Sequence, residues 1–378
     1  MEEQIQSKII QRTMFDNLCD IGTLNRAFKA VRKNNGAPGI DKITIKTYEE
    51  NLHTNLNQLS RELKSWTYKP NPVKRVDIPK LNGGTRMLGI PCVKDRIVQT
   101  AIKHIIEPQL DPKFSEHSYA FRPNRNQQKA IRNAQAIVKK GKPYVVDIDL
   151  SKFFDKIHHD KLIGRLRNFG IEREILRIIG NTLRSGIMNN GLTTASTKGS
   201  PQGSPLSPLL SNVVLDELDK ELEKRGLEFC RYADDCNIYV RTYKAASRVM
   251  ESVSKFINKK LKLEINKDKS KVALARYTKF LGMIITAAAI MISPISMKMA
   301  MAKVKELTPR RTHHTLEKQV EKVNSWYMGW SGYYRMTDKP QQLQTIESHI
   351  RRRFRAMLIA RSKTPKSLVK QLTKNGIK

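Results

Sequence analysis

The chain has 378 residues, which is longer than one typical domain core and indicates two or three subdomains that each bury an apolar centre. Hydrophobic residues make up 39% of the sequence, a fraction that excludes an intrinsically disordered chain of this charge. The 70 Lys and Arg residues against 35 Asp and Glu residues leave a net charge of +35, so the expected partner is a polyanion such as a nucleic acid.

The first part of the chain is predicted to be mainly helical, with one loop and one hairpin. Residues 1–65 have a helical pattern that is broken by the loop NNGAPGID, whose glycines and proline interrupt any regular element. An alternating run from Val73 and an Asn-Gly-Gly centre at 82–84 predict two antiparallel strands joined by a tight turn. Apolar residues at helical spacing predict amphipathic helices from Asp95 to Pro108 and near 126–140.

The rest of the chain changes from a mixed pattern to a wholly helical one. Residues 144–150 form a compact β-rich run, 171–183 have helical spacing, and 229–240 are typical of a hairpin with its tip at Ala233, Asp234 and Asp235. After the tip, Cys236, Ile238 and Val240 fit the inward-facing period of a strand. Strands returned by hairpins and backed by helices predict an α+β fold rather than a doubly wound parallel sheet. Beyond about residue 297 the sequence is helical and strongly basic, which predicts a separate helical domain.

The cysteines and the apolar segments indicate where in the cell the protein is located. The four cysteines form no CxxC pair and have no His partner at metal-ligand spacing, as is typical of reduced thiols inside a cell. The N-terminal MEEQIQSKII lacks the apolar core of a signal peptide, and the most apolar stretch, 281–295, is interrupted by polar residues and Pro294. We therefore expect no membrane anchor.

Two acidic sites lie within apolar strands. Asp234 and Asp235 stand among β-formers, where charged groups are costly unless a cation meets them. Asp147 and Asp149 share one face of another strand, because side chains alternate with period two. Nucleotidyl transfer needs carboxylates from separate strands to grip two Mg²⁺ ions about 4 Å apart, and Asp149 with Asp234 would supply them. A lone Asp more often caps a turn, and charge alone favours a non-catalytic ribosomal or chromatin-like binder, but the two acidic sites together favour catalysis.

The order of motifs resembles the reverse transcriptases encoded by bacterial group II introns, in the compact class that lacks an endonuclease domain. The resemblance covers nearly the whole chain through NNGAPGID, RVDIPKLNGGTRMLGIP, SYAFRPNRN, VVDIDLSKFFD, SPQGSPLSPLLSN, RYADD, LKLEINKDKSKV and YTKFLGMII. It implies an α+β right-hand polymerase with an N-terminal extension and fingers at 1–145, a palm at 146–290, and an all-helical thumb or maturase X region at 291–378. Little or no DNA-binding domain would follow, and no nuclease module.

The resemblance also implies a catalytic set. Asp149 matches the family's carboxylate four residues before a Phe-Phe pair, and with Asp234 and Asp235 it would bind two Mg²⁺ ions, with Mn²⁺ as an alternative. Asp147 is then a structural residue. Lys269 matches a lysine proposed as the general acid for the leaving pyrophosphate, although the neighbouring Lys267 and Lys271 are close enough to be confused with it, and all three could simply face solvent.

The residues implied to bind the nucleotide and the nucleic acid come from other motifs. Phe154 would exclude a 2′-hydroxyl, although a core position is the commoner fate of such a residue, and Gln202 would touch the nucleotide while Gly203 permits close approach. The full nucleotide-binding set is Lys80, Arg86, Phe154, Gln202 and Arg75. The nucleic-acid-binding set is Arg122, Arg125, Arg351, Arg352, Arg353 and Arg355. The aromatic residues of NSWYMGWSGYYR at 324–335 favour a core stripe over a base-stacking platform.

The function that the resemblance implies is RNA-directed DNA polymerisation together with a maturase role in group II intron splicing and retromobility. The partners would be an RNA template, in particular the intron RNA, a DNA primer or target, dNTPs and, as in some relatives, a second copy of the chain. The location would be the bacterial cytoplasm, with the nucleoid or a ribonucleoprotein. Two alternatives stay open: a non-catalytic RNA-binding splicing cofactor, and a group II-like polymerase of DNA repair or phage defence.

Overall fold

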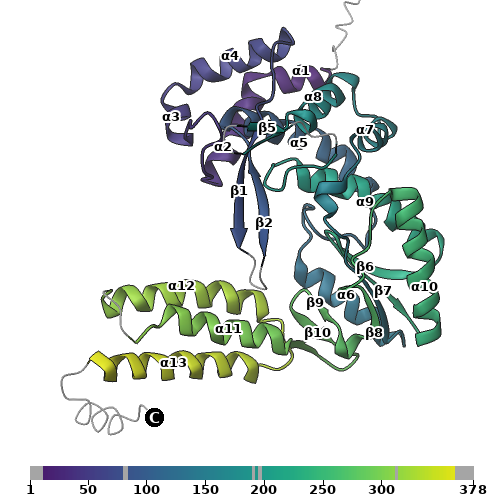
Figure 1. Ribbon diagram of the computed structural model, residues 1–378, viewed down its shortest axis with the longest axis vertical. Helices are drawn as coiled ribbons and strands as arrows, with labels where there is room; N and C mark the ends of the chain where they lie inside the picture. Colours follow the sequence, from purple (N-terminus) through teal and green to yellow (C-terminus); the bar gives the residue numbers. More distant parts are fainter. Residues whose placement is uncertain (1–11, 80–83, 190–191, 195–197, 311–313, 362–378) are drawn as a thin grey trace, which may run out of the picture. The chain divides into compact units, whose positions relative to one another are not determined.

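The computed structural model of the protein describes residues 12–79, 84–189, 192–194, 198–310 and 314–361 (Figure 1). Its α-helices are α1 (Met14–Cys19), α2 (Ile21–Lys33), α3 (Ile45–Glu50), α4 (Leu52–Lys64), α5 (Val93–Leu110), α6 (Gln127–Lys139), α7 (His159–Asn168), α8 (Arg173–Arg184), α9 (Ser207–Lys224), α10 (Tyr243–Phe256), α11 (Pro294–Leu307), α12 (Leu316–Tyr334) and α13 (Gln341–Arg361). Its strands are β1 (Val73–Pro79), β2 (Thr85–Ile90), β3 (Tyr144–Ile148), β4 (Ile187–Asn189), β5 (Leu192–Thr194), β6 (Glu228–Tyr232), β7 (Asp235–Val240), β8 (Lys271–Leu274), β9 (Lys279–Phe280), β10 (Met283–Ile285) and β11 (Ile290–Ile292).

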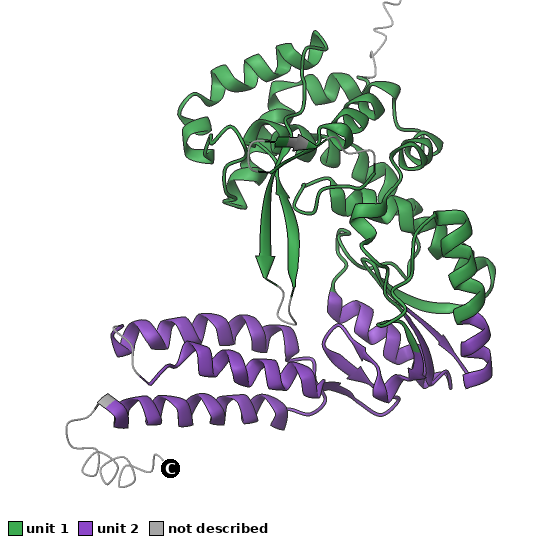
Figure 2. Ribbon diagram, viewed as in Figure 1, with its two compact units in different colours: residues 1–126, 148–236, 250–271 green, residues 127–147, 237–249, 272–378 purple. Residues whose placement is uncertain are grey.

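The chain divides into two compact units, drawn in green and purple in Figure 2. Unit 1 comprises residues 1–126, 148–236 and 250–271, and unit 2 comprises residues 127–147, 237–249 and 272–378. The predicted boundaries at 145 and 290 separate fingers, palm and thumb, which are defined by their roles in a polymerase. The two units are defined by contacts within the chain, so they do not test these boundaries, which stay a prediction.

The helices at the start of unit 1 begin at residues that the sequence marks as caps. Thr13 and the Asp16 side chain form a capping box at α1, and Asp20 accepts the backbone N–H of Thr23 at 2.9 Å at the start of α2. The apolar face of α2, which includes Leu24 and Phe28, is fully buried. The amphipathic helix predicted from Asp95 is confirmed as α5.

The predicted hairpin is confirmed as β1 and β2, which pair antiparallel with Lys74 opposite Ile90 and Pro79 opposite Thr85. Of its predicted turn, Asn82 and Gly83 lie outside the described residues, while Gly84 has a left-handed φ of 77°. β1 also pairs parallel with β4, which gives a sheet of order β2-β1-β4-β5. The hairpin thus has a strand neighbour on its β1 side.

The strands that carry the predicted carboxylates belong to a sheet of order β6-β7-β3-β8. The tip between β6 and β7 is confirmed as a tight turn, in which Ala233 has a left-handed φ of 57°. Cys236, Ile238 and Val240 are buried, as predicted for the inward side of β7. Asn237 and Tyr239 on the other side are buried as well, at 1% and 2% exposure, so β7 has no exposed face.

The C-terminal helices of unit 2 form a bundle of α11, α12 and α13, which run side by side in Figure 1. Their core is Ala300, Val304 and Ile346, with Trp326 and Trp330 packed against it. The prediction that these aromatic residues form a core stripe is therefore confirmed for this pair, whose rings stack at 6.0 Å. A sheet of order β11-β10-β9 precedes the bundle, and the Gln342 side chain joins the two by bonding both the N–H and the carbonyl of Ile292.

Two further features concern the apolar segments and the thiols. No helix in the described part of the chain is long and apolar enough to cross a membrane. The four cysteines are free thiols, and all of them are buried.

Candidate polymerase active site

Asp149 follows β3 directly, and its backbone is fixed from both sides. Its N–H donates to the Ser270 hydroxyl at 3.0 Å, and its carbonyl accepts the N–H of Asn266 at 2.8 Å. Ser270 and Asn266 belong to the NKDKSK run, so this run positions the carboxylate in addition to supplying lysines. Of the two contacts only that of Ser270 is made by a side chain, and a serine hydroxyl near a turn is a common backbone partner.

Asp234 lies in the turn between β6 and β7, where it is within electrostatic reach of three predicted site residues. Burial raises the pKa of its carboxyl above the usual range, and the negative charge of Asp149 raises it further. The positive charges of Arg86 and Lys269 act in the opposite direction. The structure therefore brings Asp149, Asp234, Arg86 and Lys269 together.

Among the candidate lysines, Lys269 is the one that contacts a predicted catalytic carboxylate. Its Nζ lies 3.4 Å from Oδ2 of Asp149, and its side chain is 66% exposed. In the described part of the chain, neither Lys267 nor Lys271 forms an ion pair. The geometry thus distinguishes Lys269 from its two neighbours, while its role as a general acid stays a prediction.

A residue that the sequence analysis did not single out supports the same turn. Arg231, on β6, is completely buried, and its guanidinium forms a two-point ion pair with the equally buried Asp219, through Nε to Oδ1 at 2.7 Å and Nη2 to Oδ2 at 2.5 Å. Its Nη1 donates to the carbonyl of Ala233 at 3.0 Å, and Nη2 donates to the Ser118 hydroxyl at 2.7 Å. Arg231 therefore anchors the backbone immediately before Asp234.

The loop with Gln202 is bonded to the hairpin with Arg86. The carbonyl of Gln202 accepts the N–H of Gly89, on β2, at 2.7 Å. Gly203 has a φ of 110°, and a Cβ at this position would stand 2.8 Å from the carbonyl of Gly89. Gly203 thus permits a close approach to β2, which joins two segments of the predicted nucleotide site, while its close approach to the nucleotide stays a prediction.

The remaining candidates for the nucleotide site differ in the solvent exposure of their side chains. Phe153 is buried, whereas Phe154 is half-buried, so the core alternative describes Phe153 better. Arg75 is exposed, and its guanidinium forms an ion pair with Asp77 on the same strand at 3.1 Å. Lys80 lies outside the described residues.

The two arginines of SYAFRPNRN have different surroundings. Arg122 is 6% exposed, and its guanidinium donates to the Asp111 carboxylate and to the carbonyls of Ser115 and Ser118. The guanidinium of Arg122 thus holds this loop together, and a contact of Arg122 with nucleic acid stays a prediction. Arg125 is half-exposed and forms an ion pair with Glu116 at 2.6 Å, a surface contact that a phosphate could replace.

The four arginines of α13 are also not equivalent. Arg353 is half-buried and donates to the carbonyl and the hydroxyl of Thr308, so it closes the end of α11. Arg355 is half-buried as well. Arg351 and Arg352 are exposed, and Arg351 has only a long contact of 3.4 Å to Glu347. The last two are therefore the better placed for a nucleic-acid backbone.

The predicted catalytic carboxylates are also the candidate ligands of a metal ion. The described residues contain no group of three or more His, Cys, Asp or Glu side chains arranged to hold one. Mg²⁺ is commonly held by one or two carboxylates together with substrate phosphates, however, rather than by a protein cage. The partly buried Asp149 and Asp234, whose charges act on each other, are two carboxylates of this kind, and the exposed Asp235 adjoins Asp234.

Comparison with known proteins gives independent information. Residues 78–285 match the family model described as reverse transcriptase (RNA-dependent DNA polymerase), and residues 297–376 match that of the group II intron, maturase-specific domain. The chain is 33% identical over 274 residues to Protein YkfC of Escherichia coli (strain K12), covering 62% of this chain and 72% of YkfC. It is 31% identical over 208 residues to the group II intron-encoded protein LtrA of Lactococcus lactis subsp. cremoris, covering 54% of this chain.

The chain spans only about a third of LtrA, since the match covers 34% of that protein. Among solved structures, a chain of a partial Cas6-RT-Cas1--Cas2 complex is similar with a TM-score of 0.43 and 25% identity, over 66% of this chain and 43% of that one. The family match confirms the fold class and the family predicted from the motifs. With more than half of its length inside the family model, the chain belongs to the reverse transcriptase family of RNA-directed DNA polymerases, and it carries a group II intron maturase-specific domain after the polymerase domain.

Proposed function

We propose that this chain extends a DNA primer on an RNA template, with dNTPs as substrates and with two Mg²⁺ ions held by Asp149, Asp234 and Asp235. A reverse transcriptase domain implies a metal-dependent polymerase in general, while the identity of the metal and of its ligands is our proposal. The observation that supports it is the contact of Nζ of Lys269 with Oδ2 of Asp149 at 3.4 Å, together with the electrostatic effect of Asp149, Arg86 and Lys269 on Asp234.

Each side chain has a task in this reaction. Metal ions, when bound, polarise the attacking 3′-oxygen and neutralise charge on the phosphates. Asp149 and Asp234 would supply their oxygen ligands, while the guanidinium of Arg86 would bind the triphosphate as a fork of charged donors. Lys269 would give a proton from Nζ to the leaving pyrophosphate. The half-buried ring of Phe154 would select against a 2′-hydroxyl.

We further propose that the natural RNA partner is a group II intron RNA, which the chain helps to splice and to insert into DNA. The maturase-specific domain match supports this proposal, as does the similarity to LtrA, which is described as encoded by such an intron. The exposed Arg351 and Arg352 would contact RNA phosphates, with the bacterial cytoplasm as the site of action.

Primer extension tests the catalytic part of the proposal. A labelled DNA primer on an RNA template is incubated with dNTPs and either Mg²⁺ or EDTA, with the wild type, Asp149→Asn and Asp155→Asn. The exposed Asp155 provides a matched control, because it lies close in sequence to Asp149 but outside the proposed site. We expect extension only with Mg²⁺, a loss in Asp149→Asn, and unchanged extension in Asp155→Asn. Intact RNA binding without extension in the wild type would instead favour the splicing-cofactor alternative.

A further inference from the structure

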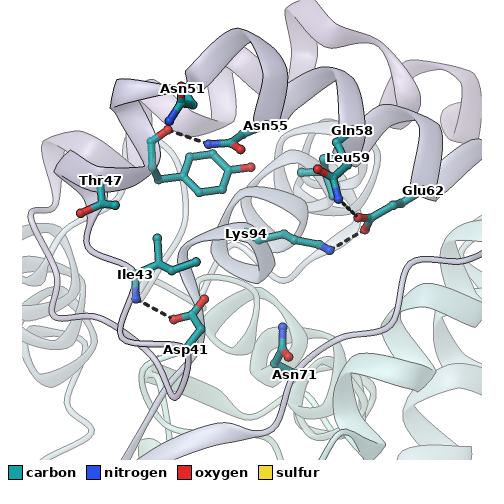
Figure 3. A pocket seen from close by; sticks show the side chains of 11 residues that line it. Asp41, Ile43, Thr47, Asn51, Asn55, Gln58, Leu59, Glu62, Asn71 and Lys94 are labelled. Atoms are coloured by element: carbon teal, nitrogen blue, oxygen red, sulfur yellow. Dashed lines mark hydrogen bonds and ion pairs between the residues drawn. The ribbon is translucent and has the colours of Figure 1, made fainter.

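A polar pocket lies in unit 1 among α3, α4, the loop before α3 and the start of α5 (Figure 3). Its volume is about 360 Å³. It is lined by Asp41, Ile43, Thr47, Tyr48, Asn51, Asn55, Gln58, Leu59, Glu62, Asn71 and Lys94. In a chain with a net charge of +35, this lining holds two carboxylates and four amides but a single cation, so its chemistry differs from that of the chain as a whole.

Three of the four amides in this pocket each use one of their two N–H groups in a hydrogen bond, while their carbonyl oxygens accept none among the described residues. Nδ2 of Asn55 donates to the carbonyl of Tyr48 at 3.0 Å, and Nε2 of Gln58 donates to Oε1 of Glu62 at 3.0 Å (Figure 3). Nδ2 of Asn71 likewise donates to the buried carboxylate of Asp95 at 3.1 Å. Each amide therefore keeps its carbonyl oxygen for another partner, and Glu62 keeps lone pairs beyond those that it uses.

Two donors face this set of acceptors. Lys94 reaches Oε2 of Glu62 at 2.5 Å, which leaves two of its three N–H groups for a ligand. Tyr48 lines the pocket, is 6% exposed, and its hydroxyl forms no hydrogen bond with any described residue. Burial raises the pKa of this hydroxyl, as do the charges of Glu62 and Asp95, so it is present as a neutral O–H donor. Because Tyr48 lines the pocket, this hydroxyl offers an O–H donor to a bound ligand.

The ligand that fits must be rich in N–H donors and must also offer an acceptor. A cationic peptide would supply donors, but the charge of the whole chain repels it, whereas the same charge attracts RNA. Within RNA, guanine presents the most donors on its Watson–Crick edge, namely N1–H and the N2 amino group, beside the acceptor O6. The volume of the pocket accommodates one base.

We propose that this pocket binds an unpaired guanine of the RNA partner, with the Glu62 carboxylate accepting from N1–H and the N2 amino group and with Lys94 donating to O6. The inference rests on the proposed RNA partner, and it adds a base-specific contact outside the polymerase site. Because the amides and the carboxylate contact the base rather than a phosphate, the site distinguishes guanine from the other bases of the RNA.

The test compares RNA pentamers that differ in one central base. Fluorescence anisotropy at one fixed salt concentration measures the affinity of the wild type for pentauridine with a central guanine, hypoxanthine or uracil. Hypoxanthine lacks only the N2 amino group, so it removes one donor to Glu62. We expect the guanine pentamer to bind about tenfold more tightly than the hypoxanthine pentamer. Equal affinities for the three pentamers would overturn the proposal.

Two variants and a matched control locate the preference. Glu62→Gln should abolish it, Gln58→Ala should weaken it, and Glu50→Gln, which changes an exposed carboxylate outside the pocket, should retain it. A preference that persists in Glu62→Gln, with thermal unfolding like that of the wild type, would place the recognition elsewhere. Primer extension on a guanine-free RNA template is measured with the same preparations. Extension without a base preference refutes this inference alone, whereas failure of extension refutes the proposed polymerase function.

Discussion

The buried ion pair of Arg231 and Asp219 should determine both the stability of unit 1 and the position of the catalytic turn. Arg231→Met leaves the Asp219 carboxylate, with a side chain that is 0% exposed, without its counter-ion. Removing one partner of a buried ion pair costs about 3–5 kcal/mol of unfolding free energy, since the remaining charge is left uncompensated. The same change removes the donor to the Ala233 carbonyl, so the carboxylate of Asp234 loses its fixed position.

A double variant separates the two effects. Arg231→Met with Asp219→Leu removes both charges, and it should recover stability to within about 2 kcal/mol of the wild type. It should not recover primer extension, because the Ala233 carbonyl still lacks its partner. Urea unfolding followed by circular dichroism measures the first quantity, and extension rates measure the second. A loss of less than about 1 kcal/mol in Arg231→Met, or full activity in the double variant, would refute this reasoning.

Three other perturbations have defined outcomes. Gly203→Ala places a Cβ 2.8 Å from the carbonyl of Gly89 on β2, at a backbone φ of 110°. It should lower the free energy of unfolding by about 1–3 kcal/mol and raise KM for dNTPs. An unchanged KM would contradict the link between the Gln202 loop and the hairpin. Lys269→Met should lower kcat about 10²-fold while Lys267→Met leaves it within about twofold, and equal effects would remove the special role of Lys269. Burial raises the pKa of the Cys19 and Cys92 thiols to about 11, so iodoacetamide at pH 8 should alkylate them about a hundredfold more slowly in the native protein than in urea. Rapid native alkylation, followed by mass spectrometry, would show that these sites open.

The sequence predicted the elements whose signals are local. The hairpin of β1 and β2 was predictable because alternating strands flank an Asn-Gly-Gly turn, and α5 because its apolar residues recur at helical spacing. The pairing of Asp149 with Asp234 followed from the needs of metal chemistry and from the family motifs. The hairpin and α5 depend on residues that lie close together in the chain, whereas Asp149 and Asp234 lie far apart in it and were paired through their motifs.

The features that were missed depend on distant contacts. Arg231 is one residue in an apolar strand, and its partners Ser118 and Asp219 are identified only when the chain is folded. The ion pair of the buried Arg122 with Asp111 was likewise not predicted, because it forms only when the loop is folded. Arg231 and Arg122 follow the same physical rule, because the N–H groups of a buried guanidinium must find hydrogen-bond acceptors within the protein.

Primer extension by the variant Asp234→Asn plus Asp235→Asn tests the central claim most directly. The substitutions keep the size of the side chains in the turn but remove the charge that would hold metal ions. The account predicts that the variant binds the RNA template and primer with nearly the affinity of the wild type and extends the primer at a rate below detection, at every Mg²⁺ concentration. Extension by this variant at a rate close to that of the wild type would contradict the assignment of these carboxylates to catalysis.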